Sequence, residues 1–187
     1  AALAAEVQWA RGHTHVGAIA LTDWATQDRK AIGLETRAGQ LGLSVNLFWA
    51  REPTSGLRPR SAGDELSLRD AADRIASDFS TSAAIALSSY ATKELTRALN
   101  IAGRRPGIDF SLIALGCWDW MHDVANPPLS HIVLPFHTVG RKAARILNTL
   151  SIRELGSIER EIVVNVSSVD IHCLEAGTVT DFNKNCI

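Results

Sequence analysis

The apolar positions along the chain fall into two kinds of run. Continuous apolar stretches of strand length occur at 16–21, 44–49, 83–87 and 110–115. Between them, apolar residues recur three or four positions apart, as on one face of a helix, at 1–11, 28–39, 67–79 and 91–102. Strands that alternate with helices predict βαβ units. Because these strands are apolar on both faces, we expect an α/β fold with a doubly wound, mostly parallel sheet covered by helices on both sides.

Several element boundaries also follow from local residues. The first helix is expected to stop at Gly12. Ser67 is expected to cap a helix with one apolar face, formed by Leu68, Ala71, Ala72, Ile75 and Phe79. Residues 50–66 are rich in Pro, Gly, Ser and Arg and predict a long exposed loop. A short strand at 131–134, a helix at 138–150 and one or two strands within 161–174 complete the pattern.

Composition narrows the class of protein. The chain has 187 residues, 46% hydrophobic and 21% charged, with a formal net charge of −1, as in ordinary globular proteins without a membrane span. No basic block exceeds two residues, which argues against direct binding of a nucleic-acid phosphate backbone by this segment. Three well-separated cysteines predict neither disulfides nor zinc and fit a reducing cytoplasm. The chain opens without a methionine or a signal peptide, and we expect it to be part of something longer.

Common catalytic and cofactor motifs are absent from the sequence. It contains no dinucleotide-binding glycine motif, no P-loop and no nucleophile elbow. The pair His13 and His15 could hold a metal, but two surface histidines are the simpler interpretation. Asp119 and His122 could form an acid/base pair, and Cys117 could be a reactive thiol, but a polar loop and a small buried residue are the simpler interpretations. We therefore predict no catalytic residue, no metal and no cofactor.

A ligand site is expected where parallel strands end. Such sheets bind ligands at the carboxyl ends of their strands, here the loops 22–28, 88–90 and 116–122. Trp24, Trp118 and Trp120 lie in two of these loops. Their rings could stack on a sugar or another ring, or could seal the loops against the core, and the sequence leaves both interpretations open.

Three stretches, in order, resemble the effector-binding core of the lactose-repressor (LacI/GalR) family of bacterial transcription regulators. They are WARGH leading into VGAIAL, then AAIALSSYATKELTRALNIAGRRPGIDFSLIALG, and finally NPPLSHI followed by VGRKAA. The resemblance implies a periplasmic-binding-protein-like type I fold. Residues 1–130 would form its C-terminal lobe, 131–157 the returning part of the N-terminal lobe, and 158–187 the final crossover and return. The strand at 131–134 and the helix at 138–150 would then lack most of their sheet, and we expect them to be loosely packed or covered by another chain.

The resemblance also implies an effector site. Lys30 stands where the family places an effector-clamping Arg, Ser88 and Ser89 replace its Asn-Asp turn, and Gly116 and Cys117 replace its Asp pair. Lys offers a point charge where Arg offers a planar fork. The expected effector-binding residues are Trp24, Asp28, Arg29, Lys30, Ser88, Ser89, Trp118 and Asp119.

By this resemblance the chain is the ligand-sensing core of a cytoplasmic, non-enzymatic and homodimeric regulator. A small polar effector, a sugar or another small molecule, would bind between two lobes and modulate DNA binding by a helix-turn-helix upstream of Ala1, in a domain not present in this chain. One alternative is an exported, periplasmic-type sugar- or solute-binding protein, which shares the fold. Another is an enzyme that uses Asp119, His122 and Cys117.

Overall fold

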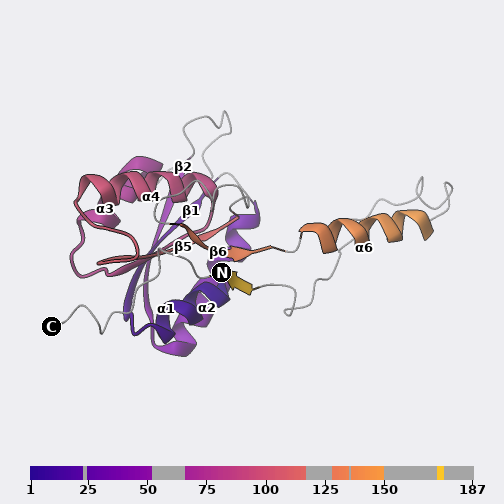
Figure 1. Cartoon of the computed structure of the whole chain (residues 1–187), viewed down its shortest axis with the longest axis horizontal. Helices are drawn as coiled ribbons and strands as arrows, with labels where there is room; N and C mark the ends of the chain where they lie inside the picture. The colour runs from indigo at the N-terminus through magenta and orange to yellow at the C-terminus, as the bar shows by residue number, and fades with distance from the viewer. Residues whose placement is uncertain (23–24, 52–65, 117–127, 135, 150–171, 175–187) are drawn as a thin grey trace. The chain divides into compact units, whose positions relative to one another are not determined.

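The computed structural model of the chain describes residues 1–22, 25–51, 66–116, 128–134, 136–149 and 172–174 (Figure 1). The chain divides into two compact units. The first comprises Ala1–Ile132 and Cys173–Ile187, and the second comprises Val133–His172. Each unit is described by itself.

A seven-stranded sheet with the order β3-β2-β1-β4-β5-β6-β7 forms the centre of the fold. Its strands are β1 (His15–Leu21), β2 (Ser44–Arg51), β3 (Leu66–Ser67), β4 (Ala83–Ala86), β5 (Ser111–Leu115), β6 (Ser130–Val133) and β7 (His172–Leu174). All pairings from β3 to β6 are parallel, with Val16 of β1 opposite both Val45 and Ala83. The predicted parallel α/β sheet is confirmed.

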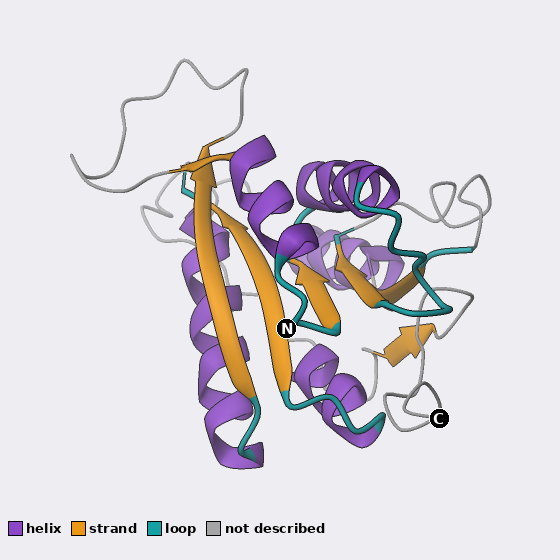
Figure 2. Cartoon of the chain, turned by 90° about the vertical axis from the view of Figure 1, so that its left-hand side faces the viewer, coloured by secondary structure: helices purple, strands orange, loops and turns teal. Residues whose placement is uncertain are grey.

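Helices cover both faces of this sheet. They are α1 (Ala2–Ala10), α2 (Ala25–Leu41), α3 (Leu68–Ser77) and α4 (Ser89–Ile101). Helix α1 packs against α2, and α3 packs against α4. Figure 1 shows the first pair on one side of the sheet and the second pair on the other, and Figure 2 shows strands enclosed between helices.

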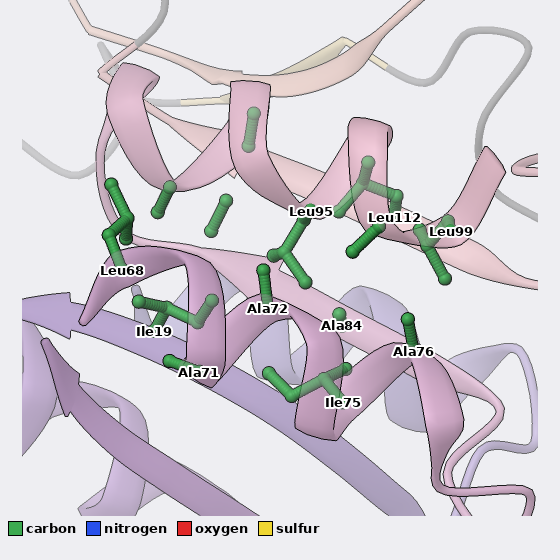
Figure 3. Close-up of a cluster of buried hydrophobic side chains, with 14 of the residues drawn as sticks. Ile19, Leu68, Ala71, Ala72, Ile75, Ala76, Ala84, Leu95, Leu99 and Leu112 are labelled. Carbon is green, nitrogen blue, oxygen red and sulfur yellow. The ribbon is translucent and has the colours of Figure 1, made fainter. Parts of the chain in front are cut away.

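The main apolar core lies between the sheet and the pair α3 and α4 (Figure 3). Half of the buried residues in this cluster are alanines, so helix and strand backbones approach closely. The tightest approach is at Gly17 of β1, where an added Cβ would lie 2.9 Å from both γ carbons of Ile75. Only a residue without a side chain fits at this position without a shift of the neighbouring helix.

Polar side chains attach α1 to the opposite face of the sheet. Buried Gln8 donates from Nε2 to the carbonyl of Ala84 at 3.4 Å and accepts from Ser111 Oγ at 2.8 Å. His13 is 1% exposed, and its Nδ1 lies 2.8 Å from Ser82 Oγ. The expectation of two surface histidines is therefore wrong for His13, because its ring is buried beside a hydroxyl partner, while His15 is exposed.

The predicted start of α3 is confirmed, but its end is not. Ser67 Oγ accepts a hydrogen bond from the Asp70 amide at 3.0 Å, as expected of an N-cap. Helix α3 ends at Ser77, and Phe79 is 87% exposed instead of completing the apolar face. The reason is Asp78, whose backbone is extended and whose carboxylate accepts from Ser80 and turns the chain before Phe79.

The strand and the helix expected to lack their sheet behave differently from each other. Strand β6 pairs with β5, and Ser130, His131 and Ile132 are buried. The expectation that this strand is loosely packed is wrong, because its buried residues extend the same sheet beyond β5. In the second unit, α6 (Phe136–Thr149) has no buried side chain among its described residues, which agrees with the prediction that this helix is loosely packed or covered by another chain.

Two further predictions fall mostly outside the described residues. The long loop expected at 50–66 is described only at its ends, where β2 runs on to Arg51 and β3 begins at Leu66. Of the strands expected within 161–174, the described part is β7. Within the described ranges, no helix is both long and apolar enough to cross a membrane.

Candidate functional site

The strand order has a topological switch point between β1 and β4, where successive strands begin to be added on the other side of β1. From β1 the chain crosses to β2 on one side, and after β3 it returns to pair β4 with the other side of β1. The carboxyl ends of β1 and β4 are joined there by a hydrogen bond from the Leu87 amide to the carbonyl of Ile19 at 3.1 Å. Open parallel sheets bind their ligands at such a point.

Two side chains from the first turns of α2 meet the end of β4. Lys30 Nζ donates to the carbonyl oxygen of Leu87 at 2.9 Å, and Gln27 Nε2 donates to the same oxygen at 3.3 Å. The two residues are three positions apart, so they lie on the same face of α2. Gln27 is 1% exposed, whereas Lys30 is half-buried. The switch point therefore carries an ammonium group beside a buried carboxamide.

Ser88, one of the predicted ligand residues, caps the helix that begins at this edge. Its backbone is extended, and its Oγ accepts from the Ala91 amide at 3.1 Å. Its carbonyl accepts from Thr92 Oγ1 at 2.9 Å. Ser88 is buried and Ser89 is half-buried. The local sequence thus explains the start of α4, and a ligand-binding role for these serines remains a prediction.

Two buried oxygens at this edge have no hydrogen-bond partner within the described residues. They are Thr22 Oγ1, at the end of β1, and Gln27 Oε1, in α2. Ile19 and Leu21 belong to the core beneath α3 and α4, so strand alternation places Thr22 on the face covered by α2. Buried polar atoms are rarely left unpaired, so these two oxygens are candidates for further polar contacts.

The end of β5 completes the described part of the site. Gly116 follows β5 with a φ of +72°, and a Cβ added there would lie 3.7 Å from Lys30 Nζ. The ends of β4 and β5 therefore both lie beside Lys30.

The structure brings together part of the predicted set. Lys30 and Ser88 meet at Leu87, while Asp28 is half-buried and Arg29 is exposed on the same helix. Predicted residues Trp24, Trp118 and Asp119, with His122 and Cys117 of the enzyme alternative, lie outside the described residues. Sequence reasoning missed Thr22 and Gln27. The one available signal was that Gln27 shares a helix face with Lys30.

A hollow lies at the amino ends of the strands, opposite the switch point. It has a volume of about 330 Å³ and is lined by residues from the amino ends of β1 and β2 and from the turn after α3: His15, Val16, Ser44, Val45, Asn46, Asp78, Ser80 and Thr81. Hydrogen bonds from Ser80 and then Thr81 lower the pKa of Asp78. Within the described part of the chain, no cluster of three His, Cys, Asp or Glu side chains could hold a metal ion.

Comparison with known proteins identifies the class to which this fold and switch-point site belong. A family model described as a periplasmic binding protein-like domain matches residues 5–171. Since this match covers most of the chain, the chain belongs to the periplasmic binding protein-like domain family. The comparison with curated proteins gave no match.

Several solved structures of transcription regulators share this fold. A LacI family regulator from Bifidobacterium animalis subsp. lactis has a TM-score of 0.70 and 18% identity, over 96% of this chain and 62% of that one. A LacI family regulator from Arthrobacter sp. FB24, in complex with lactose, has a TM-score of 0.66 and 18% identity, over 94% and 60%. A dimeric Lac repressor with a C-terminal deletion has a TM-score of 0.72 and 14% identity, over 96% and 60%.

The chain therefore spans about three fifths of the length of these solved relatives. At these sequence identities the similarity is one of fold. At the level of the fold, it confirms the resemblance to the LacI family that the sequence motifs predicted.

Proposed function

We propose that this chain is the ligand-sensing core of a LacI/GalR-type transcription regulator, which binds a small polar effector and modulates DNA binding by an upstream helix-turn-helix. The observation that carries the proposal is the polar cluster of Lys30, Gln27 and Ser88 at the switch point of a fold shared with LacI-family regulators. The lactose complex of the Arthrobacter relative supports a sugar or similar polar molecule as the effector class.

The proposed lobes follow the resemblance in the sequence. Residues 1–130 would belong to the C-terminal lobe, 131–157 to the returning part of the N-terminal lobe and 158–187 to the final crossover. The absence of buried side chains among the described residues of α6 is what a helix separated from most of its lobe would show. The effector would bind between the lobes, with Trp24, Asp28, Arg29, Lys30, Ser88, Ser89, Trp118 and Asp119 as the contacting residues.

The remaining parts of the proposal concern partners. The regulator would be a cytoplasmic homodimer without catalytic activity or cofactor, and DNA would be bound by a domain not present in this chain. A dimeric Lac repressor of the same fold supports the homodimer. An effector changes DNA affinity only if it binds one lobe arrangement more tightly than the other. The regulatory claim therefore needs both binding and DNA readouts.

The test titrates the complete gene product with lactose, ribose, adenine and citrate, and follows the melting temperature and the affinity for operator DNA. A ligand present at about a hundredfold excess over its Kd adds about 2.7 kcal/mol of stability. In a protein of this size that raises Tm by roughly 5–10 °C. We expect one of these ligands to raise Tm and to change DNA affinity.

Two variants make the titration specific to the site. Lys30→Met removes the ammonium group at the switch point and should abolish the ligand-induced rise in Tm. Lys93→Met removes the same group from an exposed position on α4 and should leave the rise unchanged. Ligand binding that leaves DNA affinity unchanged would refute the regulatory part, and equal responses of both variants would refute the site.

A further inference from the structure

The carbonyl of Leu87 has two side-chain donors where one would satisfy it. Lys30 Nζ lies 2.9 Å from this oxygen and Gln27 Nε2 lies 3.3 Å from it. Leu87 is fully buried, and a buried carbonyl is rarely left without any donor. A second donor makes the first one dispensable, so either side chain can leave without orphaning the oxygen.

The two donors differ in their freedom to leave. Gln27 is 1% exposed, and only its Nε2 can donate to a carbonyl, which fixes the orientation of the carboxamide. Its Oε1 has no partner within the described residues, so the hydrogen bond that holds this side chain is its donation to Leu87. Lys30 has a long side chain that is only half-buried, and it carries three donor hydrogens. Lys30 is the donor that a ligand can draw away.

The end of β5 lies beside Lys30. Gly116 stands there, and a Cβ added to it would lie at van der Waals distance from Nζ, 3.7 Å away, so the glycine keeps side-chain atoms off the ammonium group. The ammonium group therefore faces the edge of the sheet where the effector is proposed to bind. Gln27, which lies deeper, does not need to move.

We propose that Lys30 is an exchangeable donor, bound to Leu87 in the free protein and transferred to the effector on binding, and that Gln27 is the positioning residue that keeps Leu87 paired during this exchange. The exchange rests on the proposed function, because it assigns a role within the same site. Gln27 itself does not touch the effector. Its effect is to lower the free energy needed to release Lys30 from the carbonyl of Leu87.

A double-mutant cycle on the whole chain tests the shared carbonyl without any ligand. Gln27→Met and Lys30→Met each leave one donor on Leu87, so each single variant should melt within about 2 °C of the parent. The double variant leaves none, and its Tm should fall by roughly 5 °C beyond the sum of the single effects. The matched pair Gln40→Met and Lys93→Met makes the same changes at exposed positions, and its effects should add.

Ligand affinity then tests the exchange itself. For whichever of lactose, ribose, adenine or citrate binds the parent protein, Gln27→Met should weaken binding roughly tenfold while leaving Tm unchanged, since Lys30 must now abandon Leu87. A residue with a merely structural role would lower Tm and leave affinity intact.

The outcomes separate the two proposals. Additive effects in the Gln27 and Lys30 cycle would overturn the shared carbonyl and the exchange with it. Binding that Gln27→Met leaves unchanged would overturn the exchange alone. Absence of binding by the parent protein to all four compounds would overturn both the proposed effector site and the exchange, even if the Tm cycle were non-additive.

Discussion

Replacing Gly17 with alanine gives the sharpest test of how the sheet packs on α3. The new Cβ would lie 2.9 Å from Cγ1 and Cγ2 of Ile75 and 3.0 Å from its Cδ1. Contacts this short require a shift of the helix, and overpacking of a core costs about 1–3 kcal/mol. Alanine recovers about 0.5–1 kcal/mol through its lower backbone entropy. We therefore expect a net loss of about 1–2 kcal/mol, or a fall in Tm of roughly 3–6 °C.

The contact can be isolated with a second substitution. Ile75→Ala removes the atoms that clash and should cost less in the Gly17→Ala background than in the parent by about 1–3 kcal/mol. Ile75→Val keeps both γ carbons and should give almost no such relief. Urea denaturation followed by circular dichroism measures all the variants on the same scale.

A matched glycine serves as the control. Gly33 in α2 has open space where its Cβ would lie, so Gly33→Ala should raise stability by about 1 kcal/mol through helix propensity alone. If Gly17→Ala and Gly33→Ala change stability in the same direction, or if Gly17 and Ile75 show no coupling, the packing argument is refuted.

Other substitutions test the caps and buried hydrogen bonds. Ser67→Ala removes the N-cap of α3 and should cost about 1 kcal/mol in urea denaturation, and an unchanged midpoint would contradict the capping role. Gln8→Leu strips the partner from the buried Ser111 hydroxyl and should cost about 1–3 kcal/mol, with Ser111→Ala recovering part of the loss. Hydrogen bonds depress the pKa of Asp78, so its carboxylate stabilises the fold above its unfolded pKa of 3.8, and this contribution is lost as pH falls through the lower folded pKa. Asp78→Asn should flatten the acid side of the stability profile, below pH 3.8, and a profile identical to the parent's would contradict the assignment.

The sequence predicted those elements whose apolar pattern reports burial directly. Strands β1, β4 and β5 are buried on both faces, so their continuous apolar runs found them within a residue or two. The start of α2 was missed by three residues, because it begins at Ala25 and its early buried position is the polar Gln27. Helical spacing also carried α3 too far, since it could not detect that Asp78 turns the chain.

The candidate site was predictable only in outline. The family motifs located Lys30 and Ser88, and the structure joins them through Leu87. They gave no reason to select Thr22 or Gln27, because a buried polar atom becomes notable only when its neighbours are known. A pattern of apolar residues records which positions are buried, and it carries no information on whether a buried amide has partners.

The many alanines of the core limit which amino-acid substitutions this protein can accept. An alanine has no rotamers to lose, so ordering this interior costs little side-chain entropy. Alanines that bring backbones close also leave little room for a larger side chain. Few other residue types can therefore replace them without destabilising the fold. Sequence change is then confined mainly to the surface and to the strand ends. An interior of this kind lets the proposed effector edge diverge without altering the scaffold that holds it.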